Sequence, residues 1–311
     1  MWLAVALVAF LAAPASIEAK AIRVVATIPD LADITEQVGG DLVKVSSLST
    51  GKENIHSVPM KPSFVSRLNR ADVVILLGLD AEHAFLPALL KTSKNPGIMY
   101  GSDGYIDCSV YLKPLNVPTV VDKSEGDLHP RGNPHYNLDP LAGKLIVKAI
   151  RDGLAAKYPE HETEFKARAD EAMARIDAKR QELEKLAEPL KGLKVVTYHR
   201  YWAYFCQRYG MEVVGEIEYK PGIEPAPTHL VSLVNTMKKE GCKIIIKANH
   251  FPDKFPKFVA EKTGAVIVEV PVCVGGMKNA ATYIDFTELL VSKIAEAAKD
   301  LEMHDPQQEK N

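Results

Sequence analysis

Apolar residues along the chain follow two alternating periods. Runs rich in valine and isoleucine predict buried strands, and the segments between them carry apolar residues three or four positions apart, which predicts amphipathic helices. One such helix is expected over residues 62–72, where Pro62 suits the first turn. The strand-like runs cover residues 22–28, 42–48, 73–79, 193–199, 211–218, 242–249 and 265–272. Because strands that alternate with helices form parallel sheets, the pattern predicts an α/β fold with two parallel-sheet lobes.

A long helix is predicted between the two strand-rich halves. Residues 161–188 contain neither glycine nor proline, and their apolar positions keep to one helix face, interrupted at Lys179. About 28 residues at 1.5 Å each would form a rod of roughly 40 Å. An ordinary surface helix is the alternative, but the length and the position favour a helix that bridges the lobes.

The first residues are typical of a secretory signal peptide. No charged residue precedes Glu18, and the apolar run of about a dozen residues is too short to span a bilayer comfortably. Cleavage after Ala15 or Ala19 would suit signal peptidase, and no cysteine lies nearby for a lipid anchor. We therefore expect a freely soluble periplasmic protein, with an uncleaved membrane anchor as the alternative. The expected organisation is a signal peptide over 1–19, an N-terminal lobe over 20–158, a linking helix over 159–190 and a C-terminal lobe over 191–311.

Composition narrows the range of partners. The 311 residues include 38 basic and 40 acidic side chains, a net charge of −2, spread along the chain. This balance argues against a nucleic-acid groove or a polybasic membrane patch. An exported protein can form disulfides, but the four cysteines show no metal-site spacing and their pairing stays open. They are Cys108, Cys206, Cys242 and Cys273.

Three histidines stand where parallel α/β sheets collect ligands, beyond the carboxyl ends of strands. His56 follows the second predicted strand, and His199 closes the strand over 193–199. His135 lies in the stretch GNPHYNLDP, where the prolines and the Asn-Leu-Asp-Pro turn exclude regular structure and hold the imidazole in place. Each histidine taken alone is more often a solvated loop residue. Together they predict a cleft site for a divalent metal, with zinc suited to neutral nitrogen ligands.

Four stretches of the sequence resemble motifs of metal-specific solute-binding proteins of ABC transporters. NPHYNLDP is similar to the family's His-x-Trp-Leu-Asp-Pro motif, with Asn137 where tryptophan is common. The other matching stretches are IHSVPMKPSFVSRLNRADVVILLGLDAEHAFLPALL, YHRYWAYFCQRYG and GIEPAPTHLVSLVNTMKKEG. The resemblance covers nearly all of the mature chain, in order. It implies two α/β lobes joined by one long helix, with a metal in the cleft between them.

The resemblance also implies roles and partners. Metal ligation maps onto His56, His135 and His199, and the cargo would pass to a membrane permease driven by a cytoplasmic ATPase. We expect a monomer that carries zinc, with manganese or iron(II) as alternatives, and no catalysis. A periplasmic zinc hydrolase and a binding protein for an organic ligand such as a siderophore are the rival hypotheses. A hydrolase is disfavoured because the chain has no H-E-x-x-H spacing.

The fourth ligand is the point at which the sequence departs from the family. Relatives commonly place an aspartate after the last strand, where this chain has Val270 and Pro271. The loop between Val121 and His135 is also short, without the His- and Asp-rich insertion of some zinc-specific relatives. The candidates for the fourth position are water, Glu269, Asp285, His250 and His129.

Overall fold

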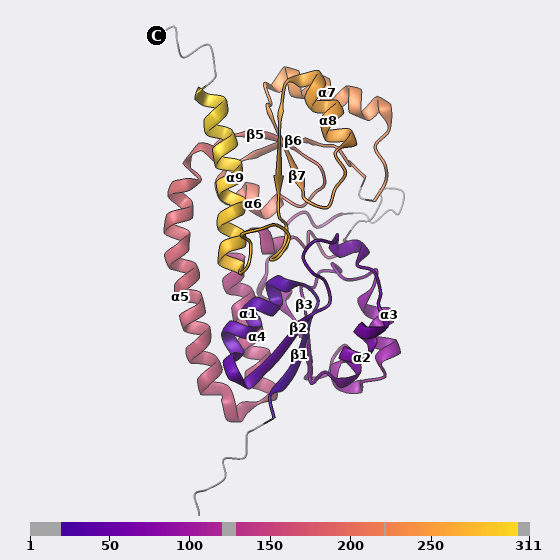
Figure 1. Cartoon of the computed structure of the whole chain (residues 1–311), viewed down its shortest axis with the longest axis vertical. Coiled ribbons are helices and arrows are strands. Elements are labelled where there is room, and N and C mark those ends of the chain that lie inside the picture. Colours follow the sequence, from indigo (N-terminus) through magenta and orange to yellow (C-terminus); the bar gives the residue numbers. More distant parts are fainter. Residues whose placement is uncertain (1–19, 120–128, 221, 304–311) are drawn as a thin grey trace, which may run out of the picture.

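The computed structural model describes residues 20–119, 129–220 and 222–303. The predicted signal peptide, residues 1–19, lies outside them. Two α/β lobes follow one another along the long axis of the molecule, and two long helices run beside them (Figure 1). The predicted fold class is confirmed. In the described part of the chain, no helix combines the length and the apolar character that crossing a membrane requires.

The N-terminal lobe is built on a parallel sheet of order β2-β1-β3-β4. Three of its strands are the apolar runs of the sequence, and Ile22 of β1 lies opposite Val43 of β2. The fourth strand was not predicted, because three residues are too few to show a period. The strands are β1 (Ile22–Ala26), β2 (Val43–Ser47), β3 (Val73–Leu76) and β4 (Tyr105–Asp107). The helices of this lobe are α1 (Pro29–Gly39), α2 (Pro62–Arg70), α3 (Leu86–Ser93) and α4 (Ala142–Lys157).

The C-terminal lobe repeats the same topology. Its sheet has the order β6-β5-β7-β8, again parallel, and all of its strands were predicted. They are β5 (Lys194–Thr197), β6 (Glu212–Glu216), β7 (Ile244–Ala248) and β8 (Val266–Val270). The helices are α6 (Ala203–Tyr209), α7 (Pro227–Glu240), α8 (Lys254–Thr263) and α9 (Tyr283–Met303). Short 3-10 turns occur at η1 (Gly40–Leu42), η2 (Ile55–Ser57), η3 (Pro96–Ile98), η4 (Cys108–Tyr111), η6 (Tyr136–Leu138), η7 (Pro159–His161) and η8 (Glu188–Leu190).

The long helix α5 (Glu162–Leu186) runs along the side of both lobes (Figure 1). Its 25 residues make a rod of about 37 Å. The apolar face is buried at Phe165, Ala169, Ala172, Ile176 and Leu183. Lys179, which interrupts that face in the sequence, reaches Glu182 on its own helix (2.6 Å) and Glu288 on α9 (3.1 Å). The helix therefore packs against the N-terminal lobe through α1 and α4 and against the last helix of the chain.

All four cysteines are free thiols and all are buried. Burial raises the pKa of the Cys108 and Cys273 thiols well above the usual value, because an apolar surrounding disfavours the thiolate. The structure therefore favours free thiols among the alternatives that the sequence left open.

Candidate metal centre

The three predicted histidines converge at the seam between the lobes. His56 lies in η2 after β2, His135 directly precedes η6, and His199 follows β5. The ring centroids are 5.0 Å apart for His56 and His135, and His199 lies 5.9 Å from each of them. His199 therefore lies beside the two N-terminal-lobe rings, but outside the group of side chains whose ring nitrogens all lie within 4.8 Å of one another.

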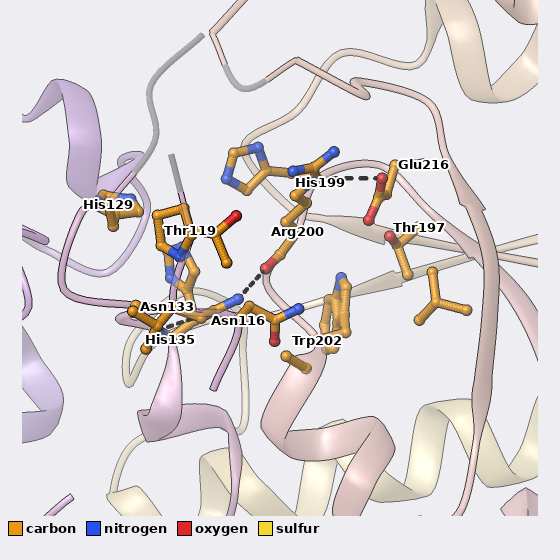
Figure 2. Close-up of a pocket in the computed structure, with 15 residues that line it drawn as sticks. Asn116, Thr119, His129, Asn133, His135, Thr197, His199, Arg200, Trp202 and Glu216 are labelled. Atoms are coloured by element: carbon orange, nitrogen blue, oxygen red, sulfur yellow. Dashed lines mark hydrogen bonds and ion pairs between the residues drawn. The ribbon is translucent and has the colours of Figure 1, made fainter. Parts of the chain in front are cut away.

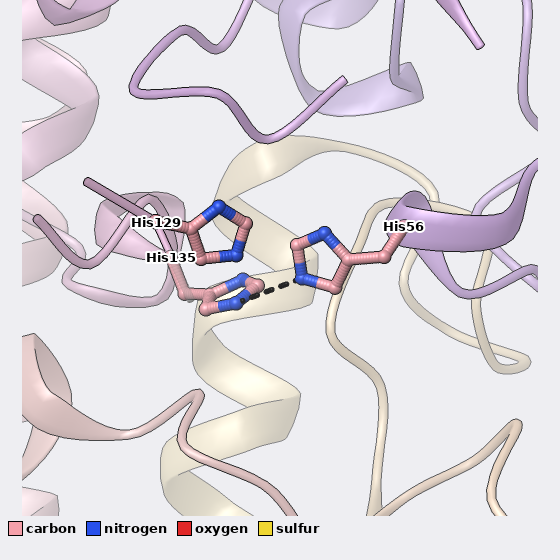
Figure 3. Close-up of side chains that lie close together, drawn as sticks. All are labelled: His56, His129 and His135. Carbon is pink, nitrogen blue, oxygen red and sulfur yellow. Dashed lines mark hydrogen bonds between the residues drawn. The ribbon is translucent and has the colours of Figure 1, made fainter. Parts of the chain in front are cut away.

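The distance between two ring nitrogens matches the requirements of a shared cation. The Nε2 atoms of His56 and His135 are 3.2 Å apart (Figure 3). Two nitrogens bound tetrahedrally to one zinc ion at about 2.0–2.1 Å lie about 3.3–3.4 Å from one another. These two atoms could therefore bind the same ion with little movement.

A further histidine, His129, lies beside this pair. One ring nitrogen from each of His56, His129 and His135 lies within 4.8 Å of the other two. The His129 ring is 4.7 Å from His56 and 6.1 Å from His135, measured between centroids (Figure 3). Position in the sequence placed His129 among several candidates, and only the fold brings it next to the predicted ligands.

The other candidates for the fourth position have different partners. Glu269 forms an ion pair with Lys247 at 2.5 Å, and Asp285 accepts from the backbone N–H of Thr282 at the start of α9. The Nε2 atom of His250 lies 3.2 Å from the hydroxyl oxygen of Tyr201, and burial lowers the pKa of His250 to about 4. Of the candidate side chains, His129 is the one that shares a cluster with His56 and His135.

Hydrogen bonds orient two of the imidazoles. The Nδ1 atom of His56 is 3.3 Å from the carbonyl oxygen of Ala81, and that of His199 is 2.6 Å from Oε2 of Glu218. Each acceptor favours the tautomer with the proton on Nδ1, which leaves the Nε2 lone pair for a cation. No pattern in the sequence identifies these acceptors, although Glu218 ends the predicted strand over 211–218.

The position of Glu218 follows from the sheet. Beyond the end of β6, the backbone continues to pair with the strand beside it: the N–H of Ile217 donates to Thr197 and that of Glu218 to Tyr198. This pairing carries the Glu218 carboxylate to the residue that follows Tyr198, which is His199. The backbone hydrogen bonds between β5 and β6, and their continuation beyond β6, therefore also set the contact between the Glu218 carboxylate and the His199 imidazole.

The carbonyl that orients His56 belongs to a sharp turn after β3. Gly78, Leu79 and Asp80 all have positive φ angles, of 87°, 51° and 63°. The buried carboxylate of Glu82 holds this turn by accepting from the backbone N–H of Leu77 at 2.6 Å and from Gly78 at 3.3 Å. Burial raises the pKa of Glu82 to about 7, against three hydrogen bonds that favour its charged form, including one from the Thr27 hydroxyl.

The loop that carries His135 is held from both lobes. The backbone N–H of His135 donates to Oδ1 of Asn133 (2.9 Å). Nδ2 of the same Asn133 donates to the carbonyl of Arg200 (2.7 Å), the residue next to His199. Farther along, the Asn137 amide donates to Asp30 and to the carbonyl of Val272. The stiff loop predicted from its prolines is thus also fixed by side-chain amides that reach across the seam.

The environment keeps the buried rings neutral. The pKa values of His56 and His135 lie well below 6.5, first because burial disfavours the charged imidazolium and then because the neighbouring histidines repel it. A neutral imidazole is the form that binds a metal. The cluster is therefore ready to bind a cation without first losing protons from these two rings.

A cavity of about 560 Å³ borders the cluster. His129, His135 and His199 line one side, and Thr197, Trp202 and Glu216 lie on another (Figure 2). Arg200 also lines it, while its side chain binds Glu216 and the carbonyl of Tyr219. Solvent-sized space therefore reaches the histidines from this side.

Comparison with known proteins agrees with this geometry. The family model described as "ZnuA: Zinc-uptake complex component A periplasmic" matches residues 24–297. The chain belongs to this family. It is therefore a metal-binding solute-binding protein of the kind that serves ABC transporters, which is a family of binding proteins and not a family of enzymes. The resemblance seen in the motifs is confirmed.

Individual members of the family are distant in sequence. The "High-affinity zinc uptake system protein ZnuA" of Brucella abortus (strain 2308) is 27% identical over 131 residues, which are 42% of this chain and 39% of the relative. The "Metal ABC transporter substrate-binding lipoprotein SloC" of Streptococcus mutans is 24% identical over 254 residues, 80% of this chain and 79% of the relative. A solved structure, that of the Mn-bound periplasmic metal binding protein from Candidatus Liberibacter asiaticus, shares the fold with a TM-score of 0.73 at 20% identity, covering 89% of this chain and 99% of that one.

Proposed function

We propose that this protein captures zinc in the seam between its lobes and delivers it to the membrane permease of an ABC transporter. The observation that carries the proposal is the 3.2 Å approach of the Nε2 atoms of His56 and His135, with His129 and His199 beside them. Membership in the zinc-uptake family supports transport as the purpose of this binding.

The proposed ligands come from both lobes. His56, His129 and His135 belong to the N-terminal half, and His199 belongs to the C-terminal half. An ion bound to all four would link the lobes directly, so loading would stabilise their mutual position. The acceptor groups at Ala81 and Glu218 support this assignment, because they leave Nε2 available on His56 and His199.

Zinc is the cargo that this ligand set favours. Imidazole nitrogens suit zinc, whereas manganese prefers carboxylate and water oxygens. The carboxylate of Glu218 contacts Nδ1 of His199, so we assign it to the support of that ring and not to the ion. Manganese, seen in the relative from Candidatus Liberibacter asiaticus, and iron(II) are the alternatives that a metal competition would test.

We place the protein in the periplasm after removal of residues 1–19, as a freely soluble monomer without enzymatic activity. The family description supports the periplasmic location. Lipid attachment, which the name of the Streptococcus relative implies for that protein, is the alternative, and mass spectrometry of the mature N-terminus would distinguish the two.

The decisive experiment is a competition titration against a chelating dye. His56→Ala, His135→Ala and His199→Ala should each lower zinc affinity at least about tenfold, because each removes a ligand. His161→Ala is the matched control, since this histidine packs on Phe165 at the start of α5, outside the cluster. Wild-type affinity in all three cluster variants would refute the site. Turnover of ester substrates by the zinc-loaded protein would favour the hydrolase, and metal-free protein purified with an organic molecule would favour the third hypothesis.

A further inference from the structure

A tyrosine of the C-terminal lobe lies among the proposed ligands. Tyr201 follows His199 by two residues and is only 2% exposed. Its ring centroid is 4.2 Å from that of His135 and 4.5 Å from that of His199, and the rings meet at steep angles of 68° and 64°. The His56 ring lies 6.4 Å away. The ring of Tyr201 therefore packs against ligands from both lobes.

The hydroxyl group of Tyr201 reaches across the seam to the turn that carries His56. It donates to Oδ1 of Asn54, with 3.2 Å between the two oxygens. The same Oδ1 atom accepts from the backbone N–H of His56 at 2.9 Å, and Asn54 thereby caps the 3-10 turn η2. One amide oxygen thus joins the backbone of His56 to a side chain of the opposite lobe.

His250 is the second partner of this hydroxyl group. Its Nε2 atom lies 3.2 Å from the hydroxyl oxygen of Tyr201. Because an amide oxygen can only accept, the proton of Tyr201 points to Asn54, and the Nε2 atom of His250 must donate. The hydrogen bonds therefore run in one direction, from His250 through Tyr201 to Asn54. They fix the hydroxyl proton in the orientation that the turn of His56 requires.

A turn after β7 holds His250 in place. The backbone N–H of Phe251 donates to the carbonyl of Ala248, which closes the turn around His250. The ring of His250 lies 4.4 Å from that of Phe251, and Phe251 stacks on Tyr198 at 4.1 Å, measured between centroids. The Nδ1 atom of His250 is buried and has no hydrogen-bond partner among the residues that the structure describes. The contact of His250 with the hydroxyl group is thus made through Nε2 on a fixed ring.

We propose that Tyr201 and His250 are positioning residues of the metal site, which hold the turn of His56 from the opposite lobe. This inference rests on the proposed function. Neither side chain binds the ion. The bond from Tyr201 to Asn54 forms before an ion arrives, so it reduces the freedom that His56 must lose on binding and thereby raises the affinity. The competing role for His250 is direct ligation through Nδ1.

A double-mutant cycle, measured by titration of zinc against a chelating dye, tests the proposal. Tyr201→Phe keeps the ring and removes only the hydroxyl group, so the affinity should fall roughly five- to tenfold, the effect of about one hydrogen bond. His250→Leu should cause a smaller loss, roughly threefold, because the hydroxyl group can still reach Asn54 without it. The double variant should bind no more weakly than Tyr201→Phe, since His250 acts only through that hydroxyl group.

Two further variants make the cycle specific. His250→Gln should restore most of the affinity lost in His250→Leu, because its amide can donate to the Tyr201 oxygen in place of Nε2. Tyr111→Phe is the matched control. It removes an exposed hydroxyl bond to Asp152 (2.7 Å), between η4 and α4, and should bind zinc as the wild type does.

Three results would overturn the positioning role. The first is wild-type affinity in Tyr201→Phe. The second is a pair of losses that add in the double variant, which would make His250 a ligand in its own right. The third is an affinity of His250→Gln as low as that of His250→Leu, which would show that the donated hydrogen bond is not what matters. Failure of the proposed function would appear differently, as wild-type affinity in His56→Ala and His135→Ala.

Discussion

The Nδ1 atom of His199 lies 2.6 Å from Oε2 of Glu218, and both side chains are largely buried. The pair joins the ends of two adjacent strands of the C-terminal sheet, β5 and β6. A carboxylate in this position fixes the tautomer of the ring and increases the electron density at Nε2. In the proposed function, Glu218 would act on the metal through His199 without contacting the ion.

Removing the charge of Glu218 should weaken zinc binding. Glu218→Gln keeps a hydrogen-bond acceptor near Nδ1 but not the negative charge, so we expect affinity to fall about 10- to 100-fold. Glu216→Gln is the matched control, because Glu216, two residues earlier at the end of β6, faces Arg200. Equal affinities for both variants in a dye competition would show that the Glu218 carboxylate does not tune the site.

The amide of Asn133 should matter for zinc affinity, because it couples the loops of His135 and His199 through two hydrogen bonds. Asn133→Ala removes both, and at about 1 kcal/mol each the loss should lower affinity by up to about 30-fold. Isothermal titration calorimetry would measure it. Asn69→Ala, which removes a single bond from α2 to the carbonyl of Ser93, should bind zinc as the wild type does.

Zinc binding should persist in mildly acidic solution. The pKa values of His56 and His135 lie well below 6.5, so both rings stay neutral as the pH falls through that value. Calorimetry at pH 6.5 in buffers of different ionisation enthalpy should show little proton release from these two rings. A release of about one proton, traced to His56 and His135 by its loss in their alanine variants, would contradict the lowered pKa values, because two rings with a pKa near 6.5 are each half protonated at this pH.

The buried carboxylate of Glu82 should give the metal-free protein a pH-dependent stability. Its pKa rises from 4.5 to about 7 on folding, so between these values the folded state holds a proton that the unfolded state has released. The contribution of Glu82 to the stability of the folded protein is therefore complete below pH 4.5 and declines as the pH rises toward 7. In urea unfolding, the free energy of unfolding of Glu82→Gln should decline less steeply with pH over this interval than that of the wild type. Parallel curves for the two proteins would show that Glu82 does not titrate there.

The side chain of Phe165 should anchor the long helix. It is fully buried on the face of α5 that packs inward, and Phe165→Ala should lower the free energy of unfolding by about 3–5 kcal/mol. Glu164→Ala changes the neighbouring exposed position and should have an effect within about 0.5 kcal/mol. Similar chemical denaturation midpoints for the two variants would mean that α5 does not depend on this contact.

Local patterns in the sequence determined much of this protein. The valine- and isoleucine-rich runs, the glycine-free stretch over 161–188 and the strand-end positions of His56, His135 and His199 can all be seen without coordinates, because periodicity and strand polarity are properties of neighbouring residues. Only the tertiary structure placed His129, and not His250, in one group with His56 and His135. It also placed Glu218 and the carbonyl of Ala81 behind the rings and brought His83 to the edge of the cluster. The Ala81 carbonyl, for example, meets a ring 25 positions away in the chain, and His135 approaches one 79 positions away. Contacts of that kind depend on how loops pack across the seam between two sheets, and no short-range spacing in the sequence encodes them.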